Sequence, residues 1–105
     1  MKDDAPVVLL VEDNPHHAEM IFRLLRNRRI AHRIKHVSDG EAALDYLYRR
    51  GVYADHLLYP TPHLVLLDLR LPKVDGLEVL KQIKSSENLC SLPVVVVSSS
   101  EADRD

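Results

Sequence analysis

The sequence has few of the features that mark secreted, membrane-spanning or nucleotide-binding proteins. Its 105 residues include one cysteine, Cys90, which excludes an internal disulfide and a multi-cysteine zinc site. The longest early apolar run, Val7–Val11, is too short for a signal-peptide core or a membrane span. Only three glycines are present, in neither a G-x-x-x-x-G-K nor a G-x-G-x-x-G pattern, so nucleotide binding has no support. These absences predict a cytoplasmic protein.

Charge is nearly balanced, with 14 Lys+Arg against 16 Asp+Glu and a formal net charge of -2. This balance gives no electrostatic reason to expect nucleic acid or an anionic membrane as a partner. The hydrophobic fraction of 46% and the charged fraction of 29% are typical of an ordered globular protein. The length is that of one domain, so we expect residues 1–105 to form a single unit.

Apolar segments of strand length alternate with helical patterns along the chain. Strands are predicted at 7–11, 32–37, 63–67 and 92–97. Helices are predicted at 15–27, from a capping box at 38–41 to a close at Gly51, and at 77–85 with Leu77, Leu80 and Ile83 facing inward. This alternation predicts an α/β fold, a doubly wound parallel sheet with helices on both faces.

Acidic residues stand where the predicted strands end. Glu12 and Asp13 follow the first strand, Asp68 follows the third, and Ser98 follows the fourth. Ligands of open parallel sheets bind at the carboxyl ends of the strands, so these side chains should meet at one rim. Three carboxylates there would repel one another unless a hard cation such as Mg2+ compensates them. Asp68, at the end of the most buried strand, is then the candidate nucleophile for phosphoryl transfer.

A plainer interpretation exists for each carboxylate alone. Loops are polar, and aspartates often cap helices, so Asp13 or Asp68 taken singly is more often structural. The pair Glu12 and Asp13 could also serve only to favour the positive end of the helix that follows. The combination of three carboxylates and a hydroxyl at one rim is what favours a site.

Three segments carry a resemblance to a known family: VLLVEDN at 8–14, LLDLRLPKVDG at 66–76 and PVVVVS at 93–98. In order and spacing they resemble the response-regulator receiver domain of two-component signalling, a chemotaxis-regulator-like module. The resemblance implies a flavodoxin-like sheet of strand order 2-1-3-4. It also implies that the family's fifth strand, the lysine that ends it and the fifth helix are missing, so that 1–105 is a receiver incomplete at its C-terminus.

The resemblance also assigns roles to individual residues. It makes Asp68 the acceptor of a phosphoryl group from a histidine kinase, and Ser98 the switch residue that hydrogen-bonds this group. It implies that Mg2+ is held by Glu12, Asp13 and Asp68 with the backbone carbonyl of Arg70. Such a receiver is not a turnover enzyme, although it takes part in its own phosphoryl transfer. Its output passes to a downstream protein partner.

The run Asn14-Pro15-His16-His17 and the tyrosine-containing insertion at 52–62 narrow the resemblance further. They are similar to single-domain receivers paired with phytochrome-type histidine kinases. His16 and His17 could contact such a partner or a metal, although adjacent histidines in a first helical turn are more often simply solvent-exposed. The tyrosines around the insertion are expected to pack its loop.

Two other functions remain open on sequence alone. The first is a receiver-like interaction module that is never phosphorylated, favoured by the missing lysine, which Lys73 in the wrong loop cannot replace. The second is a Mg2+-dependent phosphohydrolase of the haloacid dehalogenase type, which also forms an aspartyl phosphate. That class has an Asp-x-Asp pair, whereas here Arg70 stands two residues after Asp68.

The last strand predicts self-association. Without a fifth strand, Val94–Val97 forms a flat apolar edge with unpaired backbone groups. We also expect the apolar surface of Val65, Leu67, Val95 and Val97 to be partly bare. The chain should therefore form a dimer or a larger assembly through this edge.

Overall fold

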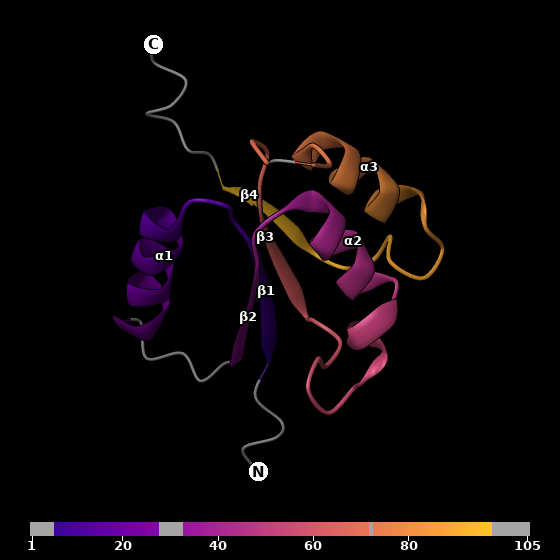
Figure 1. The fold of residues 1–105 in the computed structure, drawn as a ribbon, viewed down its shortest axis with the longest axis horizontal. Helices are drawn as coiled ribbons and strands as arrows, with labels where there is room; N and C mark the ends of the chain where they lie inside the picture. Colours follow the sequence, from indigo (N-terminus) through magenta and orange to yellow (C-terminus); the bar gives the residue numbers. More distant parts are fainter. Residues whose placement is uncertain (1–5, 28–32, 72, 98–105) are drawn as a thin grey trace.

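The structure is a computed structural model that describes residues 6–27, 33–71 and 73–97 (Figure 1). Its centre is one sheet of four parallel strands in the order β2-β1-β3-β4. The strands are β1 (Val7–Val11), β2 (Arg33–Val37), β3 (Leu64–Asp68) and β4 (Val94–Val97). The predicted fold class and strand order are therefore confirmed, and the observed strand bounds lie within two residues of the predicted ones.

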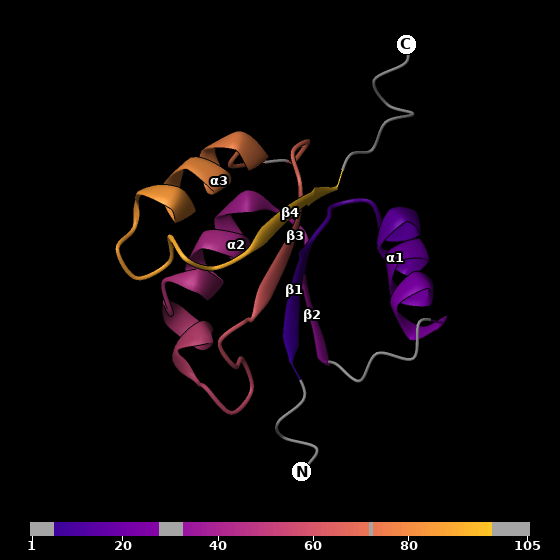
Figure 2. The same cartoon turned by 180° about the vertical axis from the view of Figure 1, so that it is seen from behind.

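Helices cover both faces of the sheet, as the alternating pattern predicts. Among the described residues, helix α1 (Pro15–Asn27) covers one face, while α2 (Gly40–Leu47) and α3 (Gly76–Ser85) lie side by side on the other (Figures 1 and 2). A short 3-10 helix, η2 (Gly51–Ala54), follows α2. None of the helices in the described part of the chain is long and apolar enough to cross a membrane.

Strand β1, and not β3 as predicted, is the most buried strand of the sheet. It pairs with β2 on one side and β3 on the other, and all five of its residues are buried. The unbroken sequence Val-Val-Leu-Leu-Val suits this place because both faces of the strand are covered. The register pairs Val11 with Leu67, so β1 and β3 end at nearly the same level. The residues just beyond them are therefore brought together.

The core on the α2 and α3 face corrects one expectation. Val65 and Leu67 are fully buried, because Val79 and Ile83 of α3 pack in the same cluster. The prediction that Val65 and Leu67 are partly bare was therefore wrong. Val95, in contrast, is 50% exposed, as predicted.

Helix α2 begins and ends differently from the prediction. Its N-cap is Asp39, not Ser38, and the Asp39 carboxylate accepts a hydrogen bond of 2.7 Å from the N–H of Ala42. It ends at Leu47, before Gly51, because Arg49 takes the left-handed conformation with φ 62°. The N–H groups of Arg49 and Arg50 donate to the carbonyls of Tyr46 and Asp45, a Schellman end. Sequence reasoning assigned this end to glycine, the residue that usually occupies it.

One of the three residues predicted to face inward from helix α3 faces solvent instead. Leu77 is 58% exposed, whereas Val79 and Ile83 are buried and Leu80 is half-buried. Gly76, Val79 and Ile83 follow the 3–4 residue spacing of one helical face, and Leu77 lies off that face. Val79 and Ile83 belong to the core cluster that includes Val65 and Leu67, and Leu80 packs against it.

Candidate metal centre at the carboxyl end of the sheet

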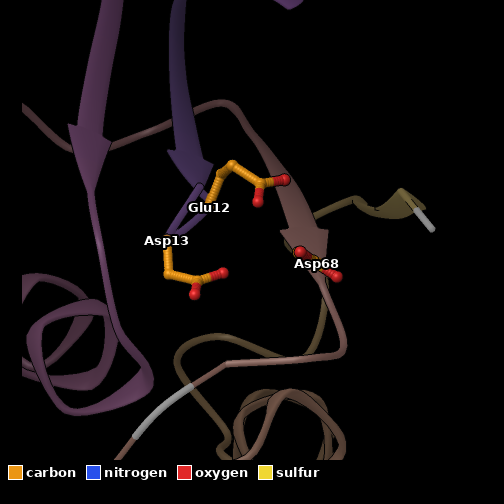
Figure 3. A group of neighbouring side chains, drawn as sticks. All are labelled: Glu12, Asp13 and Asp68. Atoms are coloured by element: carbon orange, nitrogen blue, oxygen red, sulfur yellow. The ribbon is translucent and has the colours of Figure 1, made fainter. Parts of the chain in front are cut away.

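Three carboxylates converge at the carboxyl end of the sheet. Glu12 and Asp13 directly follow β1, and Asp68 is the last residue of β3. One oxygen from each lies within 4.8 Å of the others. Figure 3 shows Glu12 and Asp13 reaching from the end of β1 toward Asp68. The convergence expected from the strand ends is therefore present in the structure.

The backbone just after each strand holds two of these carboxylates in place. The Glu12 carboxylate accepts a 3.1 Å hydrogen bond from the N–H of Asn14. The Asp68 carboxylate accepts a 3.0 Å bond from the N–H of Arg70. In both cases the donor lies two residues later in the chain, so the turn leaving the strand also orients the side chain.

The three side chains differ in exposure. Glu12 and Asp68 are 3% and 1% exposed, whereas Asp13 is exposed. Burial raises the pKa of Glu12 to about 6, and the hydrogen bond and charge of Asp68 act in the same direction. The hydrogen bond from Asn14 and the nearby His17 oppose this rise in the pKa of Glu12. Burial beside Asp68 therefore disfavours the ionised form of the Glu12 carboxyl.

A hard divalent cation fits this donor set. All three groups offer carboxylate oxygen, the ligand that Mg2+ and Mn2+ prefer, and none offers sulfur. Because Asp13 is exposed, the cluster reaches the surface and leaves room for water or a substrate oxygen on the cation. A cation bound here would lower the pKa of Glu12, since it stabilises the ionised carboxylate.

His17 contributes to this site in a way that sequence reasoning missed. Its Nδ1 lies 3.7 Å from the Glu12 carboxylate, and the side chain is half-buried rather than simply solvent-exposed. The available signal was the position of His17 in the first turn of α1, five residues after Glu12. A distance below 4 Å, however, depends on side-chain rotamers that a sequence pattern does not fix.

Lys73 is engaged at the start of α2. Its Nζ lies 3.8 Å from the carboxylates of Asp39 and Glu41, and its backbone has φ 70°. This placement agrees with the expectation that Lys73 does not replace the family's lysine.

The loop after Asp68 fits tightly against its neighbours. A Cβ added at Gly40 would lie 1.9 Å from the backbone oxygen of Val74. A Cβ added at Gly76 would lie 2.5 Å from the backbone oxygen of Asp68. Both positions therefore require glycine, because the backbone approaches closely at each. The loop is held between the acidic cluster and the start of α2.

The structure does not show the roles predicted for two site residues, Ser98 and Arg70. Ser98 lies outside the described residues, and its role stays a prediction. Arg70 is described, and its N–H holds Asp68, but the use of its carbonyl as a metal ligand also stays a prediction.

Comparison with known proteins gives the family. The sequence profile of the response regulator receiver domain matches residues 8–105. The chain therefore belongs to the response-regulator receiver domain family. Relatives that carry this domain are response regulators of two-component systems.

Two curated relatives illustrate the match. The probable methanogenesis regulatory protein FilR2 of Methanothrix harundinacea is 50% identical over 98% of this chain and 64% of its own length. Response regulator Rcp1 of Synechocystis is 40% identical over 94% of this chain and 65% of its length. This chain thus spans less than two thirds of the length of these curated relatives.

Solved structures show the same fold. The Mn2+-bound form of Rcp1 has a TM-score of 0.83 and 41% identity, covering 93% of this chain and 70% of that one. The phosphorylated cyanobacterial phytochrome response regulator RcpA has a TM-score of 0.83 and 44% identity, covering 94% of this chain and 70% of that one. The chain is similar to receivers that have been seen with a divalent metal and in the phosphorylated state.

Proposed function

We propose that this chain is the phosphoacceptor domain of a two-component phosphorelay. Asp68 accepts a phosphoryl group from the histidine of a histidine kinase, and the change in surface is read by a downstream protein. The observation that carries this proposal is the cluster of Glu12, Asp13 and Asp68 at the ends of neighbouring strands. A buried nucleophile beside two further carboxylates is costly for folding alone but suits a metal-assisted transfer.

Each residue of the site has a separate role in the phosphoryl transfer. An oxygen of Asp68 bonds to phosphorus while the phosphorus–nitrogen bond of the donor breaks, and the electron pair stays with the histidine nitrogen. The N–H of Arg70 orients the Asp68 carboxylate for this attack. Glu12 and Asp13, with Asp68 and the carbonyl of Arg70, would hold Mg2+, which neutralises the phosphoryl oxygens when bound. Ser98 would hydrogen-bond the transferred group.

The relatives support the metal and the kinase. Rcp1 has been seen with Mn2+, a hard cation with the same preference for oxygen as Mg2+, so Mg2+ is the proposed physiological ion. RcpA is a phytochrome response regulator, so a phytochrome-type kinase is the proposed phosphoryl donor. The receiver works in the cytoplasm without direct contact to nucleic acid or membrane, and it is not a turnover enzyme.

The proposal extends to self-association. In the described part of the chain, β4 pairs with β3 alone, and Val95 and Val96 are 50% and 44% exposed. An apolar strand with one unpaired edge favours pairing with a second copy.

Acetyl phosphate provides the direct test of phosphorylation. The 105-residue chain with Mg2+ should gain one phosphoryl group, seen by intact mass, and Asp68→Asn or a chelator should prevent the gain. Asp75→Asn, an exposed acid at the start of α3, is the matched control and should react like the parent chain. Equal addition to Asp68→Asn, or addition that ignores chelation, would contradict the proposal.

We expect this reaction to be slow, so it should be followed over hours. Within the described residues, the loop after Asp68 has one lysine, Lys73. It pairs with Asp39 and Glu41 and not with the site of the phosphoryl group. A fixed positive group at a developing phosphoryl charge is worth about 3 kcal/mol in comparable sites. A chain extended through a fifth strand that ends in lysine should react faster.

A further inference from the structure

Helix α3 has an apolar stripe on a side that the core does not use. Leu77 is 58% exposed, and Leu80 is half-buried. Both line a groove of about 600 Å3 along the helix, and Lys81 and Lys84 line the same groove. These four residues follow the 3–4 residue spacing of one helical face, and the buried residues of α3 lie on a different face. The stripe is therefore a surface that can take a partner.

The charges along this groove are arranged by sign. Glu78 lies in the first half of α3, and Lys81 and Lys84 lie in its second half. All three are exposed, and none takes part in an ion pair within the described part of the chain. When two copies of such a helix lie antiparallel, the acidic half of each meets the basic half of the other. The stripe is therefore complementary to a second copy of itself.

The open edge of the sheet lies next to this helix. Helix α3 connects β3 to β4, and β4 pairs with β3 alone among the described strands. Homodimers are most often built about a two-fold axis, which places equivalent residues opposite one another. An antiparallel strand pair satisfies that symmetry, whereas a parallel ladder uses its two strands differently. A two-fold axis beside β4 therefore makes an antiparallel pair and leaves both copies of α3 on the same face of the sheet.

Ordinary sheet dimensions then bring the two copies of α3 into contact. Neighbouring strands lie about 4.8 Å apart, so a crossover helix above β3 and β4 lies about 5 Å to one side of this axis. Its symmetry mate lies as far to the other side, so the helix axes are about 10 Å apart, close to the spacing of packed helices. The two helices also run antiparallel, as the charge pattern requires.

We propose that α3 and β4 together form one interface for a second copy of this chain, in an antiparallel two-fold dimer. This inference rests on the self-association proposed above and adds its geometry. The two β4 strands pair edge to edge, and Leu77 and Leu80 of the two copies pack across the axis. Glu78 of each copy faces the lysines of the second half of the other copy's α3.

The first test is the dimer dissociation constant of the 105-residue chain, measured by sedimentation equilibrium. Leu77→Lys should raise this constant at least tenfold, because a charge replaces an apolar contact, and the fold should survive because the residue is exposed. Leu57→Lys is the matched control. Leu57 is 92% exposed in the connection before β3, so its replacement should leave the constant unchanged.

The second test uses the charge pattern. Glu78→Lys makes the stripe wholly positive, and the double variant Lys81→Glu/Lys84→Glu makes it wholly negative. Each variant alone should dimerise at least tenfold more weakly than the parent chain at low salt, because like charges then meet. An equal mixture of the two should form a heterodimer at least tenfold tighter than either variant alone.

The outcomes separate this inference from the proposals on which it rests. A dimeric parent chain that ignores Leu77→Lys, or a mixture that associates no better than its components, would overturn the α3 interface and leave pairing at β4 in place. A monomeric parent chain would overturn both, and would show that this face is free or is covered by the chain's own residues. Leu77→Lys should still accept a phosphoryl group from acetyl phosphate as the parent chain does, so phosphorylation is tested independently.

Discussion

At the scale of single residues, the three carboxylates have unequal parts in holding a cation. Asp13 is exposed and can meet a hydrated ion first, whereas Glu12 and Asp68 are buried and gain most from its charge. Removing one carboxylate leaves the ion with less compensating charge and one ligand fewer. The cluster should therefore respond strongly to a substitution at any of its members.

The first prediction concerns Mg2+ affinity. Asp68→Asn and Asp13→Asn should each weaken Mg2+ binding about tenfold or more, a loss of about 1.4 kcal/mol. Isothermal titration calorimetry measures this, with Asp75→Asn as the control that keeps full affinity. If Asp68→Asn binds Mg2+ as tightly as the parent chain does, the cation lies elsewhere.

The second prediction concerns pH and Glu12 in the absence of metal. Burial raises the pKa of Glu12 to about 6 from its ordinary value of 4.5, so the folded chain binds more protons than the unfolded chain between these pH values. The contribution of Glu12 to stability is therefore fully present below pH 4.5 and is lost as pH rises through about 6. The difference corresponds to about 2 kcal/mol.

Urea unfolding in a chelator, at pH values from 5 to 7.5, measures that loss. Glu12→Gln removes the titrating group, so the parent chain should lose more stability than this variant as pH rises. Saturating Mg2+ should reverse the difference between the two chains, because the ionised Glu12 then has a partner. Parallel pH profiles for the two chains in chelator would refute the assignment.

The acidic cluster was predictable because it depends on topology and not on rotamers. Once β1 and β3 are neighbours, the residues that follow them must meet. The contact of His17 with Glu12 and that of Lys73 with Asp39 were not predictable, since each depends on how a long or ring-bearing side chain turns in space.

At the scale of elements, the two buried glycines show how the loop after Asp68 is fixed. The helix α2 starts at Gly40, and the backbone of Val74 rests directly on it. Gly51 is the useful contrast: its φ is 57°, but nothing lies within 4 Å of where its Cβ would be.

The third prediction uses this contrast. Gly40→Ala should destabilise the fold by about 1–3 kcal/mol, because backbone must move to admit the methyl group. Gly51→Ala should cost about 1 kcal/mol from its backbone conformation alone. Only Gly40→Ala should also weaken Mg2+ binding, since it displaces the loop attached to Asp68. Thermal unfolding and Mg2+ titration of both variants decide the matter, and equal Mg2+ affinities would show that the loop does not support the site.

The limits of prediction at this scale lie at helix ends and faces. The strands and α1 follow from apolar runs and from Asn14-Pro15, which are strong local signals. The end of α2 was misplaced because an arginine occupies the left-handed position there. In α3, Ile83 is buried as predicted, but Leu77 was wrongly predicted to face inward and the buried Val79 was overlooked.

At the scale of the whole molecule, the residues alone did not predict which strands of the sheet are neighbours. The order 2-1-3-4 came from the family resemblance, since alternating elements predict a parallel sheet but not the neighbours within it. The same uncertainty explains the error at Val65 and Leu67, whose cover by α3 depends on how the elements are placed.

The fourth prediction is that the 105-residue chain self-associates. Val95 and Val96, at 50% and 44% exposure, leave β4 apolar and open to pairing. Light scattering across a dilution series should show mass rising with concentration. Val95→Lys should shift the chain toward monomer, because a charge on an edge strand opposes pairing. A monodisperse monomer at high concentration would contradict the prediction.

The central position of β1 has a consequence for how long the acidic cluster persists during local opening. Amide hydrogens in a strand that is buried along its whole length and paired on both sides exchange with solvent almost only through global unfolding. Two of the three carboxylates are attached to the end of that strand, and the third belongs to its neighbour β3. The outer strands β2 and β4 can therefore open and close without separating Glu12 and Asp13 from Asp68, and the cluster lasts as long as the cooperative unit to which it is attached.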